Sequence, residues 1–149
     1  MGSALVLVLA VPVATWWLVG DLSTVPVSVG RDYAFRPWPI GPAAARAAGT
    51  GSLAVGGMAV AVLGWAALRR QLAARWWAVL VPLLAAGFIA GAGWRVMTAG
   101  VIGANIGAGF VIVFGGPLVL GLVTWALAFS AHLVRAGGAG TPPARPKTR

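Results

Sequence analysis

The stretch Gly100-Val-Ile-Gly-Ala-Asn-Ile-Gly-Ala-Gly-Phe110, followed by the apolar run 111–130, is the part of the sequence that best indicates the fold. Glycine is unfavourable in most helices, but inside a membrane small residues let two helix backbones approach closely. Gly103 and Gly107 are four residues apart and therefore share one helix face. Asn105 between them needs a hydrogen-bond partner if lipid surrounds it. We expect this stretch to form the closely packed centre of a helical membrane protein.

The same residues allow a functional and a structural interpretation. Gly103, Asn105 and Gly107 could line a solute path at a broken helix, as in transporters whose irregular backbone faces a cavity. Alternatively, they could belong to a helix-packing contact or to the turn between two membrane spans.

The overall composition requires that most of the surface face lipid. The chain has 149 residues, of which 60% are hydrophobic and only 9% charged, whereas soluble domains carry about 25% charged residues. It has 11 Lys and Arg against 2 Asp and Glu, but the basic residues lie between hydrophobic segments, which indicates membrane topology rather than nucleic-acid binding. Because the chain has no cysteine, disulfides, thiolate metal sites and cysteine nucleophiles are excluded.

Four segments are long and apolar enough to cross a bilayer, which takes about 20 residues. They are residues 4–20, 52–68, 76–98 and 106–132. We expect the first to be an uncleaved span, because no basic residue precedes it and it ends in two tryptophans. Pro12 and Pro117 predict kinks, the second of them near Gly115. The sequence therefore predicts an all-α, four-transmembrane-helix bundle as a single membrane domain, 1–136, followed by a disordered basic tail, 137–149.

The distribution of basic residues predicts the orientation. With four spans, one side holds seven basic residues and no acid, and the other holds four basic residues and both acids. The side with more arginine and lysine is normally cytoplasmic. We therefore expect both termini in the cytoplasm and one long outer loop, 21–51, between spans one and two. The high content of alanine, glycine, valine and arginine suggests a bacterial source, and so a multi-pass protein of the bacterial cytoplasmic membrane.

The outer loop carries the first candidate site. It interleaves basic and aromatic residues between prolines, and the residues of interest are Arg31, Asp32, Tyr33, Phe35, Arg36 and Trp38. Arginine and aromatic residues are enriched where proteins bind partners, so these residues could contact a partner or an anionic lipid head group. The alternative is a loop that is simply anchored at head-group depth, with Arg31 or Arg36 paired to Asp32. A short helix is expected at 42–48, ended by Gly49.

A second candidate is an ion pair at the outer rim between Asp21 and Arg95, which lie at the outer ends of spans one and three. The alternative is that both side chains reach separately to water. The single histidine, His132, cannot form a metal site alone, and we expect no cofactor. No acidic residue lies in the middle of a span, so the usual residue for proton coupling is missing.

These features favour a non-enzymatic membrane protein that serves as an accessory or assembly subunit. It would pack through glycine-rich helix faces and the outer loop, against another membrane protein or a second copy of itself. The alternative is a small-solute transporter or channel-forming homo-oligomer, with Asn105, Thr124 and the bend at Pro117 along the path. An enzyme acting on lipid through Asp21 or Asp32 is a third interpretation.

Overall fold

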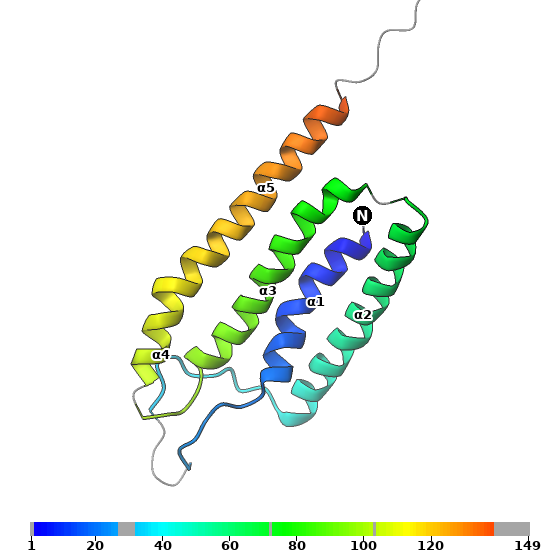
Figure 1. Ribbon diagram of the computed structural model, residues 1–149. Coiled ribbons are helices and arrows are strands. Elements are labelled where there is room, and N and C mark those ends of the chain that lie inside the picture. Colours follow the sequence, from blue (N-terminus) through cyan, green and yellow to red (C-terminus); the bar gives the residue numbers. More distant parts are fainter. Residues whose placement is uncertain (1, 27–31, 72, 103, 139–149) are drawn as a thin grey trace, which may run out of the picture.

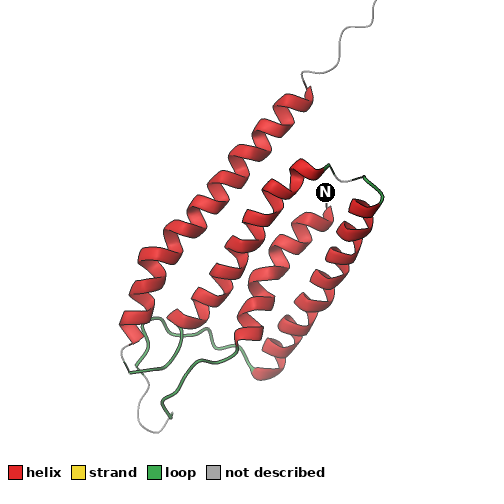
Figure 2. Cartoon of the chain, in the orientation of Figure 1, coloured by secondary structure: helices red, strands yellow, loops and turns green. Residues whose placement is uncertain are grey.

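The computed structural model describes residues 2–26, 32–71, 73–102 and 104–138, and within these ranges every regular element is a helix (Figures 1 and 2). The elements are α1 (Gly2–Val19), α2 (Pro42–Leu68), the short 3-10 helix η2 (Ala74–Trp76), α3 (Trp77–Met97), α4 (Ala104–Phe110), the π-helical turn η3 (Val111–Gly115) and α5 (Gly116–Gly138). Four stretches are long and apolar enough to cross a membrane: Gly2–Val19, Pro42–Leu68, Ala74–Met97 and Ala104–Ala136. The predicted all-α architecture with four membrane-length helices is confirmed.

The helices pack side by side in the order α2, α1, α3, α5 (Figure 1). The first helix lies between the second and the third, although the short link at 69–73 joins α2 directly to α3. The four membrane-length helices alternate in direction, so α1 and α3 are parallel. The start of α1 and the end of α5 lie at one end of the bundle along the helix axes. The described residues of the 20–41 loop and of the α3–α4 turn lie at the other end, which we call the loop end.

Small residues set the spacing between the helices. A Cβ atom at Gly91 of α3 would overlap the backbone carbonyl oxygen of Pro12 in α1, and one at Gly87 would lie 3.1 Å from the Pro12 Cδ. On the other side of α1, a Cβ at Gly56 of α2 would lie 3.5 Å from the Cβ of Ala10. Such close approach provides the van der Waals contact that holds helices together in lipid.

We expected the stretch at 100–110 to form the packed centre of the bundle, but its described helical residues lie in the outermost span of the row and pack on α3 through one face, with Ala104 and Ala108 buried. Gly100 is buried, but in the turn at the loop end, while Ile102 and Ile106 are 92% and 81% exposed. Gly107 does face α3, where its Cβ would lie 3.1 Å from the Cγ1 of Val96. The closest approach to the backbone of another helix, among the described glycines, is at Gly91 of α3, which lies against the Pro12 carbonyl of α1.

Two element boundaries also differ from the prediction. The expected short helix at 42–48 is the first part of α2, and Gly49 does not end it. Gly49 instead lies against the indole of Trp17, where a Cβ would overlap the ring, and the loop is therefore 20–41. Pro117 has no backbone N–H to donate, and directly before it the chain forms the π-helical turn η3. Such a local change of hydrogen-bond pattern accommodates a proline within a membrane helix. The helix then continues to Gly138, and the expected tail beyond it lies outside the described residues.

Candidate functional site

The loop between α1 and α2 is fastened to the end of α3 and the turn after it by hydrogen bonds, one of which is accepted by a side chain. The Phe35 N–H donates to the Met97 carbonyl at 3.2 Å, and the Gly100 N–H donates to the Ser23 hydroxyl oxygen at 2.9 Å. The Val25 N–H donates to the Gly100 carbonyl at 3.4 Å. The last carbonyls of a helix have no partner within the helix, so the loop satisfies groups that would otherwise be exposed at the loop end.

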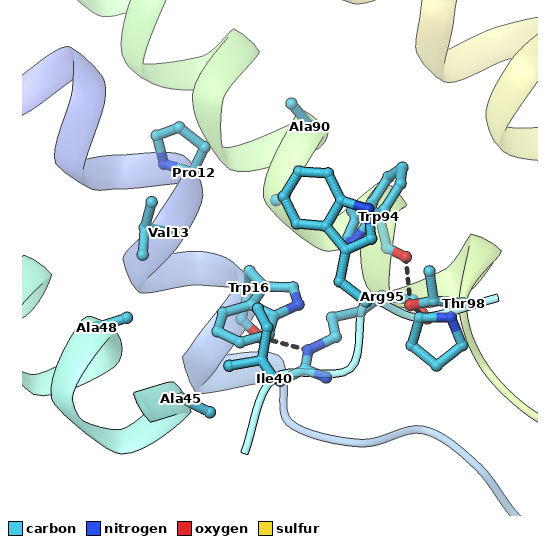
Figure 3. Close-up of a pocket in the computed structure, with 13 residues that line it drawn as sticks. Pro12, Val13, Trp16, Ile40, Ala45, Ala48, Ala90, Trp94, Arg95 and Thr98 are labelled. Carbon is cyan, nitrogen blue, oxygen red and sulfur yellow. Dashed lines mark hydrogen bonds between the residues drawn. The ribbon is translucent and has the colours of Figure 1, made fainter. Parts of the chain in front are cut away.

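A cavity of about 830 Å³ opens at the loop end, between α1, α2, α3 and residues 37–40 (Figure 3). Its walls are mostly apolar. They include Trp16 of α1, Ala48 of α2, Trp94 and Arg95 of α3, and Trp38 and Ile40 of the loop. Three indole rings from three separate segments therefore surround one space, together with one cationic side chain. This combination of a concave apolar surface and few polar groups is typical of small-molecule sites.

Arg95 is held in a fixed position at this cavity. Its Nε donates a hydrogen bond to the Trp16 carbonyl at 2.6 Å, and its guanidinium carbon lies 4.1 Å from the centroid of a Trp16 ring (Figure 3). Trp16 is in the last turn of α1, where carbonyls lack helical donors. Arg95 thus satisfies one of these carbonyls and adds a cation–π contact. The Thr98 hydroxyl, on the same wall, donates to the Trp94 carbonyl at 2.8 Å.

Arg95 combines the electrostatic attraction of Asp21, with which the sequence suggested an ion pair, with a hydrogen bond to the backbone of α1. Asp21 attracts the Arg95 guanidinium electrostatically, and its carboxylate accepts the Ser23 N–H at 3.0 Å. The hydrogen bond of Arg95, however, goes to the Trp16 backbone. From the sequence, Trp16 was only one of the two tryptophans that end the first span, because a backbone acceptor on another helix leaves no signature in sequence.

The described aromatic and basic residues of the outer loop differ in their exposure, and one of them reaches the cavity. Trp38 lines the cavity and is 76% exposed. Asp32, Phe35 and Arg36 are exposed, and Tyr33 is half-buried. Arg31 lies outside the described residues.

The described residues around Asn105 differ in the same way. Asn105 is exposed on α4, Gly107 faces α3, and Gly103 lies outside the described residues. The described part of this group supports a packing contact at Gly107 and leaves the amide of Asn105 on the outer surface of the chain.

Some small-residue positions have no neighbour in the described structure. A Cβ at Gly57 or Gly64 of α2, or at Gly121 of α5, would meet nothing within 4 Å. The fourth span is also little covered: in its membrane-length part, 6% of the residues are buried, against 28% for the span formed by η2 and α3. The two outermost helices of the row thus keep free surfaces, while Gly87 and Gly91 of α3 are packed against α1.

No protein family, curated protein or solved structure matches the chain. Its function therefore has to be argued from its own residues and their packing.

Proposed function

We propose that this chain is a non-enzymatic multi-span membrane protein that serves as an accessory or assembly subunit. The observation that carries the proposal is the open small-residue surface on α2, the helix at one edge of the row. In a bilayer, apolar surface alone gives no reason for helices to associate, because lipid is equally apolar. Small residues on one face do give a reason, since they allow a second backbone to come close.

The open surface of α2 consists of Gly57, Ala61 and Gly64, which we call the outer α2 face. Their spacings of four and three residues place them on one side of the helix. Gly57 and Ala61 are exposed. The adjacent side of the helix, about 100° around the axis, carries Gly56 and Leu63 and is buried where α2 packs on α1. The outer α2 face lies beside that contact, and α1 leaves Gly57 and Gly64 without a neighbour within 4 Å of a Cβ.

The fourth span offers a second surface for assembly. It contacts the rest of the chain through α3, and Ala126 is completely buried. Leu120, Trp125 and Leu127 on α5 are more than half exposed. A partner that covered these side chains would add contacts without displacing any contact of the chain itself.

The proposal places the protein in a bacterial cytoplasmic membrane with both termini in the cytoplasm. The seven-to-four excess of basic residues supports this orientation. The start of α1 and the end of α5 lie at the same end of the bundle (Figure 1), which is consistent with both termini on one side of the membrane.

The test uses a photoreactive residue at Ala61 in the full-length chain, crosslinked in living cells and identified by mass spectrometry. We expect a discrete product with one other membrane protein. Gly64→Leu should abolish it, because the leucine fits the free chain but blocks close approach. Gly51→Leu is the matched control: it is an equally open glycine of α2, about 120° around the helix from Gly57. A chain that gives no crosslink, or equal crosslinking in both variants, contradicts the proposal.

A homo-oligomer that forms a channel or carries a small solute is the second candidate. Asn105 and Thr124 are exposed on the fourth span, so only a neighbouring copy could enclose them along a path. In the same crosslinking experiment, a product of twice the chain mass would favour this candidate. Flux through proteoliposomes should then be lost in Asn105→Leu, and unchanged flux would contradict it.

A further inference from the structure

We propose that the cavity at the loop end binds one anionic phospholipid, with the head-group phosphate on Arg95 and an acyl chain along α1 and α3. The site is separate from the outer α2 face, so it does not depend on the proposed role in assembly. Four features of the cavity carry the assignment: its polarity, its fixed cation, its charge and its opening.

The polarity of the cavity changes with depth in the order that an amphiphile requires. Arg95 lies two residues before the end of α3, and Ala90 lies five residues deeper, about 7.5 Å along the helix axis. On α1, Pro12 lies about 10 Å from the end of the helix. The cation is therefore near the mouth, and the deeper walls are apolar. The volume of about 830 Å³ lies within the range of known ligand sites.

The cation is ordered before any ligand arrives. The hydrogen bond to the Trp16 carbonyl and the contact with the Trp16 ring fix the Arg95 side chain, so binding loses little of its conformational entropy. A guanidinium also matches phosphate oxygens in geometry, because it can donate two parallel hydrogen bonds. Arg95 thus offers a phosphate a prepared partner in surroundings of low polarity.

The charge favours an anionic ligand over a cationic one. Three indole rings could hold a quaternary ammonium group, but the Arg95 guanidinium already lies over the Trp16 ring and repels another cation. Asp21 is the acidic residue that acts on Arg95, and it is exposed. Solvent therefore screens the attraction between Asp21 and Arg95 more strongly than it would screen the attraction between Arg95 and a phosphate in the cavity.

The cavity can be entered from outside. Trp38 is 76% exposed and Trp94 is 38% exposed, so the walls form an open recess rather than a sealed void. Because the cavity lies at the end of membrane-length helices, its mouth is at the depth of lipid head groups. An anionic phospholipid of the surrounding bilayer is therefore the occupant that the position and the charge select.

The test is native mass spectrometry of the purified full-length chain, titrated with phosphatidylglycerol or with phosphatidylcholine of the same acyl chains. We expect one phosphatidylglycerol per chain, with at least tenfold weaker binding of phosphatidylcholine. Arg95→Gln should weaken phosphatidylglycerol binding about tenfold, because a charge-assisted hydrogen bond is lost. Arg69→Gln is the matched control. Arg69 also lies over a tryptophan, 5.4 Å from the Trp65 ring, but it does not line the cavity.

A second variant tests the acyl-chain part of the site and leaves Arg95 in place. Ala90 lines the cavity and is exposed, so Ala90→Phe should fill the deeper wall and exclude the lipid, whereas Ala128→Phe on exposed α5 surface should not. Equal binding of the two lipids would overturn the proposal, as would unchanged affinity in folded Arg95→Gln or in Ala90→Phe. Displacement of the lipid by inorganic phosphate would show a site for free anions instead, and would also overturn it.

Discussion

Substitution of Gly91 by alanine tests whether the contact between α1 and α3 holds the fold together. A Cβ at this position would overlap the Pro12 carbonyl oxygen and would lie 3.0 Å from the Cβ of Thr15. The obstacle is backbone, which cannot rotate away as a side chain can. Gly87, one turn earlier, is also close to Pro12, so α1 has little freedom to shift along α3. The two helices have to separate to admit one methyl group.

The expected magnitude follows from two opposing effects. Alanine has the better helix propensity, by up to about 1 kcal/mol, whereas overfilling a packed interface costs about 1–3 kcal/mol. Gly57→Ala is the matched control, because its Cβ would meet nothing within 4 Å and only the gain in propensity remains. The gain in propensity is common to both variants and cancels, so we expect Gly91→Ala to be less stable than Gly57→Ala by the overpacking cost of about 1–3 kcal/mol.

The free energy of unfolding of both variants is measured in mixed micelles, by titrating the purified full-length chain with a denaturing detergent and following helix content by circular dichroism. A difference of less than about 0.5 kcal/mol, which is within the usual range for an inconsequential surface substitution, would refute the reasoning. It would mean that α1 and α3 are not held at the distance that their glycines allow.

Three further predictions concern other parts of the chain. Pro117→Ala restores a backbone donor, so the π-helical turn at 111–115 should become α-helical, with slower hydrogen exchange across it; equal or faster exchange would contradict this. Asp21→Asn removes the carboxylate that attracts Arg95, so phosphatidylglycerol should bind more tightly in native mass spectrometry, and weaker binding would count against a phosphate at Arg95. Alkaline phosphatase, which is active only outside the cytoplasm, should be inactive when fused after Arg149 and active when inserted into the 20–41 loop; the reverse result would overturn the proposed orientation.

Hydropathy predicted the four membrane-length helices because a chain surrounded by lipid must keep its long helices apolar whatever their packing. The predicted first span at 4–20 and third span at 76–98 correspond closely to α1 at Gly2–Val19 and α3 at Trp77–Met97. Continuity at Gly49 was not predictable in this way. Glycine often ends helices, but here it lies inside α2, where the lack of a side chain leaves room for the Trp17 ring of another helix.

The order of the helices in the row could not be predicted from the sequence either. A short link joins α2 to α3, and yet α1 lies between them. The sequence identified Arg95 as a residue of interest at the end of its span, yet neither the Trp16 carbonyl nor the cavity could be inferred. Both depend on which helix packs against α3 and in what register, and small residues on several faces of every helix permit more than one answer.

The register between α1 and α3 connects the fold to the proposed lipid site. The two helices are parallel, and the contact of Pro12 with Gly91 is followed four residues later on both by the contact of Trp16 with Arg95. The position of the cation is therefore set by the close approach one turn below it. Gly91→Ala should then weaken phosphatidylglycerol binding in the chains that remain folded, although it leaves every charge in place, whereas Gly57→Ala should not. Unchanged binding in folded Gly91→Ala would show that Arg95 is positioned by its own hydrogen bond alone and not by the helix register.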